Sequence, residues 1–264
     1  MLIIFAAFVG LIVGSMINVV VSRLPEMLES EWRQMRSSNQ NHSFPNNFLF
    51  SLVFPEKFCS SCGRRVSIIH HISILRFFLR GKCQDCKTNS SARYPMVELI
   101  GSMTLGLIVW KLGFSIQAVA LFVFMMAMLM LALIDIDVQL LPNCITIPLI
   151  WLGLLYNLHL GLSELKSAVI GAVLGYLFLW GLYWVFKWIT GKEGMGFGDF
   201  KMFSAIGACL GWQALPVVLF VSSLMASLVG LGLLFFAGKN RNTEIPFGPY
   251  LSLGGVLVVL LLKH

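Results

Sequence analysis

Long apolar segments recur along the chain, with short polar connections between most of them and one larger polar region at residues 23–93. A helix needs about 20 mostly apolar residues to cross a bilayer. The pattern therefore predicts an all-α polytopic membrane protein, with a first transmembrane helix at residues 1–22, a small cytoplasmic domain at 23–93 and a transmembrane domain at 94–264. About eight membrane spans are expected: Leu2–Val21, Tyr94–Trp110, Ile116–Ile134, Cys144–Leu160, Ala168–Trp188, Phe200–Trp212, Leu215–Phe236 and Phe247–Leu262. The sixth is short, and it is either a half-span or one piece with the seventh.

The composition is that of a membrane protein. Hydrophobic residues make up 58% of the 264 residues and charged residues only 12%, which lies outside the range of soluble globular domains. The first apolar segment has no basic residue ahead of it and no small-x-small cleavage site before Arg23. It is therefore interpreted as a retained helix and not as a secretory signal.

The basic residues predict the orientation of the chain. Of the 19 Lys and Arg residues, 11 lie between Arg23 and Arg93. Cytoplasmic loops collect Lys and Arg, so this polar region is predicted to be cytoplasmic and the N-terminus to lie outside. Threading the spans from there places the connections at 135–143 and 187–199 on the cytoplasmic side as well. The net charge of +7 is explained by these loops, which lack the interleaved aromatic residues that would indicate nucleic-acid binding.

The cytoplasmic region contains two pairs of cysteines, Cys59 with Cys62 and Cys83 with Cys86. The spacing Cys-x2-Cys-x20-Cys-x2-Cys is typical of a tetrahedral zinc site, because a two-residue gap lets both sulfurs of each pair face one ion. The alternatives are disulfides or buried thiols, and a cytoplasmic location disfavours disulfides. Four thiolates fill every position on the metal, so the sequence predicts a structural zinc site.

Two aspartates reach the predicted cytoplasmic face from distant parts of the chain. Asp135 lies where the third span runs out into a turn closed by Pro142 and Asn143. Asp199 begins the sixth span, directly after an expected turn at Gly196–Gly198. Ionisable groups near membrane depth are costly and mark functional sites. Both carboxylates are therefore expected at similar depth on one side of the membrane.

Two converging carboxylates in a partly desolvated site suggest an aspartyl pair that shares one proton. One aspartate, ionised, takes a proton from water; the other, protonated, hydrogen-bonds the scissile carbonyl and then passes its proton to the leaving amine. In this hypothesis, the glycines before Asp199 let the backbone approach a substrate and adopt conformations closed to other residues. Lys201 would bias the carboxylate electrostatically. The alternative is structural, with Asp135 ending a helix and Asp199 acting as an N-cap.

Several motifs together resemble those of the type IV prepilin leader peptidases, bacterial inner-membrane aspartic proteases that carry a Gly-x-Gly-Asp motif. Besides the two cysteine pairs, the motifs that carry the resemblance are "GSMINVVVSRLP" at Gly14–Pro25, "RYPMVELI" at Arg93–Ile100, "LIDIDVQLLPN" at Leu133–Asn143 and "GMGFGDFK" at Gly194–Lys201. They occur in the family's order and cover nearly the whole chain.

The resemblance implies which residues act. Asp135, seven residues before Pro142, matches the first catalytic aspartate of the family, and Asp199 matches the aspartate of the Gly-x-Gly-Asp motif. The cysteines match the family's cytoplasmic zinc-binding domain. The residues ranked as supporting are Gly196, Gly198, Lys201, Asp137 and Pro142.

The resemblance also implies the substrate and a second activity. The expected substrates are prepilins and pseudopilins, cut at the cytoplasmic face of the inner membrane after the glycine that ends a short basic leader. Many members then methylate the new N-terminal amine with S-adenosylmethionine. No dinucleotide-type glycine fingerprint occurs in this chain, so no residue is assigned to that cofactor. Pilus or secretion machinery is a further candidate partner.

Two other classes of function compete with a peptidase. A cation transporter would use the aspartates to bind ions or protons, and it predicts a polar stripe inside several spans, where this sequence has few polar residues. A non-enzymatic assembly scaffold would dock pilus machinery through the zinc domain. In a scaffold both aspartates could be exchanged for asparagine without loss of function.

Overall fold

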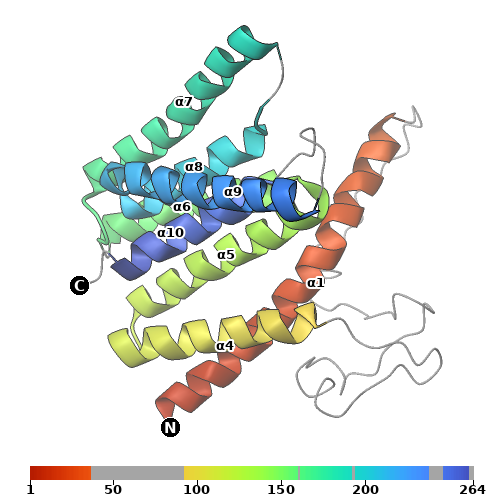
Figure 1. The fold of residues 1–264 in the computed structure, drawn as a ribbon. Helices are drawn as coiled ribbons and strands as arrows, with labels where there is room; N and C mark the ends of the chain where they lie inside the picture. Colours follow the sequence, from red (N-terminus) through yellow and green to blue (C-terminus); the bar gives the residue numbers. More distant parts are fainter. Residues whose placement is uncertain (37–91, 160, 192–193, 238–245, 262–264) are drawn as a thin grey trace, which may run out of the picture. The chain divides into compact units, whose positions relative to one another are not determined.

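The structure is a computed structural model that describes residues 1–36, 92–159, 161–191, 194–237 and 246–261. These residues form eight α-helices and one 3₁₀ turn, and they include no β-strand, as the all-α prediction required. The chain divides into two compact units, residues 1–126 and 127–264 (Figure 1).

The first unit is built on a close helix pair, α1 (Leu2–Arg36) and α4 (Arg93–Leu112). Glycines line the contact. A Cβ placed on Gly14 would lie 2.8 Å from the Cα of Glu98, and one on Gly101 would lie 2.6 Å from the carbonyl oxygen of Gly10. Small residues of this kind let two helices approach closely within a membrane.

Helix α1 is longer than the sequence pattern predicted. The first span was expected to end at Val21, but the helix continues past Pro25 to Arg36. The polar residues after Val21 are compatible with a helix that leaves the apolar region, so hydropathy marks the end of the span and not the end of the helix. Within the pair, Asn18 donates from Nδ2 to the carbonyl oxygen of Tyr94 at 2.9 Å, which satisfies a buried amide.

Helix α5 continues from the first unit into the second, and five further helices complete the second unit. Their bounds are α5 Ile116–Val138, α6 Asn143–His159, α7 Leu165–Thr190, α8 Phe197–Leu210, α9 Leu215–Ala237 and α10 Gly248–Leu261.

The short helix α8 is the core of the second unit. It packs against α6, α7, α9 and α10, and Phe200, Met202 and Ile206 have no exposed surface. Asn157 of α6 closes its C-terminal end, because the side-chain amide donates to the carbonyls of both Ala208 and Cys209 at 2.9 Å. Those carbonyls would otherwise have no partner in the helix.

Five helices are long and apolar enough to cross a membrane, which supports a multi-pass membrane protein. Each of the eight predicted spans coincides with a helix, but α6, α8 and α10 have 17, 14 and 14 residues. A helix of 14 residues is about 21 Å long, less than the roughly 30 Å of a hydrocarbon core. The five candidate spans are Leu2–Glu29, Arg93–Leu112, Ile116–Val138, Leu165–Thr190 and Trp212–Leu233.

The structure resolves the question of the sixth and seventh spans. Helices α8 and α9 are separate, because Gly211 adopts a left-handed backbone with φ of 83° and a 3₁₀ turn at Trp212–Ala214 follows. Glycine adopts that conformation without the strain that a Cβ would cause.

The contact between α7 and α8 generates a stability prediction. A Cβ on Gly171 would lie 2.5 Å from the carbonyl oxygen of Gly207 and 2.8 Å from the backbone nitrogen of Trp212. Backbone atoms cannot turn aside as a flexible side chain can, so Gly171→Ala is expected to lower the free energy of unfolding by about 1–3 kcal/mol. The measurement is thermal unfolding of the purified protein in detergent.

Gly181, on the same helix, is the matched control. A Cβ there meets nothing within 4 Å, so Gly181→Ala is expected to be neutral or to stabilise the protein by up to about 1 kcal/mol through helix propensity. Equal effects of the two substitutions would contradict the packing described for α7 and α8.

Candidate active site

Asp135 lies in the last turn of α5 and is only 5% exposed. The sequence pattern placed it in a turn after the helix, which is wrong, because α5 continues to Val138. The helix ends at Gln139, whose N–H donates to the Asp135 carbonyl at 2.9 Å and whose φ is 52°. The Asp135 carboxylate accepts a buried hydrogen bond on Oδ2 from the backbone N–H of Gly248, at 3.0 Å.

Asp199 lies in the first turn of α8 and is 7% exposed. The N-cap of α8 is Gly196, so Asp199 is the third helical residue and not the cap that the structural alternative proposed. Its carboxylate accepts a hydrogen bond from the Gly196 backbone N–H. This is the geometry of a capping box, in which the third residue of a helix satisfies the N–H of the N-cap residue.

The two glycines before Asp199 have a different role from the predicted one. Gly196 is extended, with φ of −80°, and neither glycine has a positive φ. The prediction that these glycines adopt backbone conformations inaccessible to other residues is therefore wrong. At Gly198 the reason for glycine is close packing, since a Cβ there would lie 2.6 Å from the Cβ of Leu141.

The two carboxylates interact electrostatically within the second unit. Burial, as the larger cause, and the negative charge of Asp135 together raise the pKa of Asp199 from 3.8 to about 7, and the Gly196 hydrogen bond opposes both. A raised pKa of this size means that one proton stays on the pair near neutral pH. The structure thus brings Asp135 and Asp199 together, as the sequence predicted.

Asp137 does not join this pair. It is exposed, whereas Asp135 is buried. Residues two positions apart point to different sides of a helix. Because α5 continues through both aspartates, only one of them can face the interior.

Pro142 lies in the turn after α5, and Lys201 lies in α8. Pro142 is buried, and its carbonyl accepts the N–H of Ile145 at 3.1 Å at the start of α6. Lys201 donates from Nζ to Oδ1 of Asn143 at 2.6 Å. This bond joins the first residue of α6 to α8, the helix that carries Asp199.

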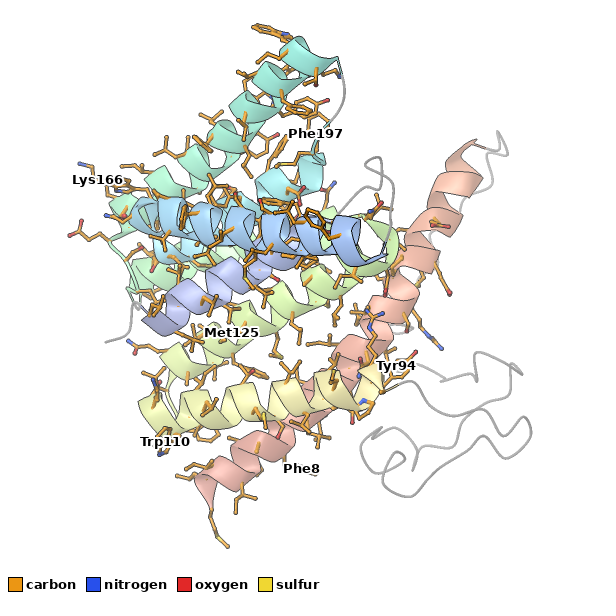
Figure 2. The ribbon with its side chains drawn as sticks, viewed as in Figure 1. Phe8, Tyr94, Trp110, Met125, Lys166 and Phe197 are labelled. Atoms are coloured by element: carbon orange, nitrogen blue, oxygen red, sulfur yellow. The ribbon has the colours of Figure 1, made fainter. Side chains whose placement is uncertain are left out.

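An aromatic cluster, which the sequence analysis did not single out, lies between α7 and the N-terminal turns of α8, the helix that carries Asp199. Phe197 lies at the N-terminal end of α8 (Figure 2). Its ring centroid is 5.3 Å from that of Tyr183, and the fully buried Phe200 lies 5.9 Å from Tyr183. The helical spacing of Tyr176 and Tyr183 on α7 was the signal for such a cluster.

Gly248 is a further residue of the site that the sequence analysis did not identify. It is the first residue of α10 and supplies the N–H that Asp135 accepts. The only sequence signal was a glycine between Phe247 and Pro249 at the start of the last apolar segment. Such a pattern is equally typical of an ordinary helix start.

The predicted zinc ligands, Cys59, Cys62, Cys83 and Cys86, lie outside the described residues. In the part of the chain that the structure describes, no group of three or more His, Cys, Asp or Glu side chains could hold a metal ion.

The geometry of the two carboxyl groups supports general acid–base chemistry. A buried pair with one proton between two carboxyl groups can accept a proton from water and donate one to a leaving group. Asp135 lies in the last turn of its helix and Asp199 in the first turn of its own.

Two family models match the chain. Residues 122–231 match the Type IV leader peptidase family, and residues 8–112 match the bacterial peptidase A24 N-terminal domain. The first of these segments contains both Asp135 and Asp199. No solved structure matches the chain.

Curated relatives are similar over nearly the whole chain. A prepilin leader peptidase/N-methyltransferase of Aeromonas hydrophila is 43% identical over 254 residues, covering 95% of this chain and 88% of the relative. The protein of that name from Pseudomonas aeruginosa is 42% identical, covering 95% and 87%, and the one from Neisseria gonorrhoeae is 40% identical, covering 96% and 88%. By family match and by full-length similarity, the chain belongs to the type IV leader peptidase family.

Proposed function

We propose that the chain is an aspartic endopeptidase of the membrane that cleaves the leader peptide of type IV prepilins or pseudopilins and then N-methylates the new N-terminal residue. The carrying observation is the buried pair of Asp135 and Asp199, in which burial and a second carboxylate raise the pKa of Asp199 to about 7. The names of the curated relatives support both activities and the substrate class.

In this proposal Asp135 and Asp199 are the catalytic residues and use one water molecule. The ionised carboxylate takes a proton from the water, and the resulting hydroxide attacks the carbonyl carbon of the scissile peptide bond. The protonated carboxyl hydrogen-bonds the carbonyl oxygen and stabilises the charge that develops on it. Its proton then passes to the departing nitrogen, so the products are a leader with a carboxyl end and a pilin with a free amine.

The distribution of basic residues suggests on which side of the membrane the enzyme meets its substrate. The concentration of Lys and Arg between Arg23 and Arg93 favours a cytoplasmic position for that region and, by threading, for the two aspartates. We propose the bacterial inner membrane as the location, with α6 and α10 completing the membrane domain around the short α8. A prepilin anchored by its apolar helix would present its leader at this face, where pilus or secretion machinery would collect the product.

The proposed methylation needs S-adenosylmethionine, which supplies a methyl group to the new amine. The described residues offer no signature that assigns a binding site for it, so no residue of this chain is given a role in that step. The order of the two reactions follows from chemistry, since the amine that accepts the methyl group exists only after cleavage.

We also propose a zinc ion on the four cysteines between α1 and α4. The support is the spacing of the two Cys-x2-Cys pairs, which suits a tetrahedral structural site. A closed site of this kind stabilises the fold of its own domain and takes no part in peptide hydrolysis.

The proposed peptidase is tested first by removing each carboxylate. Asp135→Asn and Asp199→Asn are each expected to lower cleavage of a prepilin peptide on the order of 1,000-fold or more, because the amide can neither accept nor deliver the proton. Mass spectrometry of the peptide, with and without S-adenosylmethionine, measures both activities. Glu164→Gln, at an exposed residue that precedes α7, is the control and should cleave normally. Normal cleavage by either aspartate variant, at normal protein levels, would contradict the proposed catalytic role of the two aspartates.

The zinc proposal has a separate test. The double substitution Cys59→Ser and Cys62→Ser is expected to release the metal and to lower thermal stability, since structural zinc contributes on the order of 10 kcal/mol in small zinc-dependent peptides. Elemental analysis of the purified protein measures the metal directly. Cys144→Ser, at an exposed cysteine of α6, should leave zinc in place. Stoichiometric zinc in the double variant would rule out the four-cysteine site.

A further inference from the structure

Gly248 packs directly on the Asp135 carboxylate. Its backbone N–H donates to Oδ2 at 3.0 Å in a buried hydrogen bond. A Cβ added to Gly248 would lie 2.7 Å from Oδ2 and 3.1 Å from Cγ of Asp135. Its φ is not in the left-handed region, so the need for glycine at this position comes from contact with the carboxylate and not from backbone conformation.

The donor is the first residue of a helix of 14 residues, α10. The N–H groups in the first turn of a helix have no partner within the helix, and they carry the positive end of the helix dipole. A carboxylate that accepts from such a group is held in one orientation, and the hydrogen bond favours its ionised form against the opposing effect of burial.

We propose that Gly248 is a positioning residue of the carboxylate pair, which holds Asp135 ionised as the general base and leaves the shared proton on Asp199 as the general acid. This inference rests on the proposed peptidase activity and goes beyond it, because it assigns distinct roles to the two aspartates. It also gives the N-terminus of α10 a part in the reaction, although α10 contributes no reactive side chain.

Few other ionisable groups surround Asp135. On its own helix there is the exposed Asp137, and on α8 there are Asp199 and Lys201. On α10 the only titratable side chain is Tyr250. The described part of α9 contains no Asp, Glu, His, Lys or Arg. A change in the pH dependence of a Gly248 variant would therefore arise at the aspartate pair.

The first test is the pH dependence of Gly248→Ala, measured as kcat for cleavage of a prepilin peptide by the full chain in detergent. The methyl group displaces the carboxylate, so kcat is expected to fall on the order of 100-fold with little change in KM, since misplacement by about 1 Å costs about that much. Loss of the N–H bond makes the ionised form of Asp135 less favourable. The acid limb of the pH–rate profile is therefore expected to move to higher pH, while the alkaline limb moves less.

Gly254→Ala is the matched control on the same helix. A Cβ at Gly254 would lie 2.6 Å from Oγ of Ser222 and 3.0 Å from the carbonyl oxygen of Val218, so it strains α10 at a distance from the aspartates. Its pH–rate profile should keep the position of both limbs, whatever the loss of stability. An acid limb that stays in place in Gly248→Ala, as in Gly254→Ala, would overturn the positioning role.

A second test does not depend on peptidase activity. Thermal unfolding is measured for Gly248→Ala, for Asp135→Ala and for the double variant. The nearest atoms to the added Cβ all belong to the Asp135 side chain, so Gly248→Ala should lower Tm in the native background and have almost no effect in Asp135→Ala. An equal drop in both backgrounds would overturn the contact.

The two tests separate failure of this inference from failure of the proposed function. If the native chain cleaves no prepilin peptide, the peptidase assignment falls, and the Tm comparison still decides whether Gly248 holds Asp135. If Gly248→Ala alone does not fold, recovery of a folded protein in the double variant supports the contact, and failure to recover it counts against the contact.

Discussion

Two carboxyl groups buried within reach of each other's charge cannot both be ionised at low cost, and the second unit is organised around this constraint. Desolvation penalises each charge, and each charge penalises the other. The site holds one proton as a result, near the pH at which a cell works, with the pKa of Asp199 raised to about 7. A pair in this state can act as acid and base at the same time, which is what hydrolysis of a peptide bond without a covalent intermediate requires.

The surrounding helices supply the burial and the fixed geometry. Helix α8 can lie among four neighbours because glycines face it, such as Gly171 of α7, whose Cβ would meet backbone atoms. Backbone N–H groups then orient both carboxylates, from Gly248 for Asp135 and from Gly196 for Asp199. The strongest geometric support of the site thus comes from glycines and helix ends, while the chemistry depends on only two side chains.

Much of this architecture could be predicted from the sequence, and the failures have clear causes. Hydropathy located the eight helices of the described residues because burial in a bilayer needs long apolar segments. It misplaced the ends of α1 and α5, since a helix can continue through polar residues when it leaves the apolar region. The pairing of Asp135 with Asp199 followed from topology. The contact with Gly248 did not, because a hydrogen bond from a backbone N–H across 113 positions leaves no mark in the local pattern.

The course of α5 also explains why Asp135 is buried and Asp137 is exposed. A turn at this point, as the sequence suggested, could have directed both Asp135 and Asp137 inward. A continuous helix instead separates them, and only the carboxylate on the inner side meets α8 and α10. Phe197 and Gly198 are similarly part of helix α8. At Gly198 the close approach to Leu141, and not the predicted turn, is the reason for glycine.

Thermal stability as a function of pH tests the buried pair most directly, because it needs no substrate. The pKa of Asp199 rises from 3.8 to about 7 on folding, so the native carboxyl keeps its proton where the unfolded chain has lost it. Its contribution to stability is complete below pH 3.8 and is lost as the pH rises to about 7, at about 1.4 kcal/mol per pH unit. In detergent, Asp199→Asn is therefore expected to match the native chain near pH 4 and to become progressively more stable than it towards pH 7, with a smaller gap in an Asp135→Asn background. Native and Asp199→Asn curves that stay parallel across this range would contradict the account.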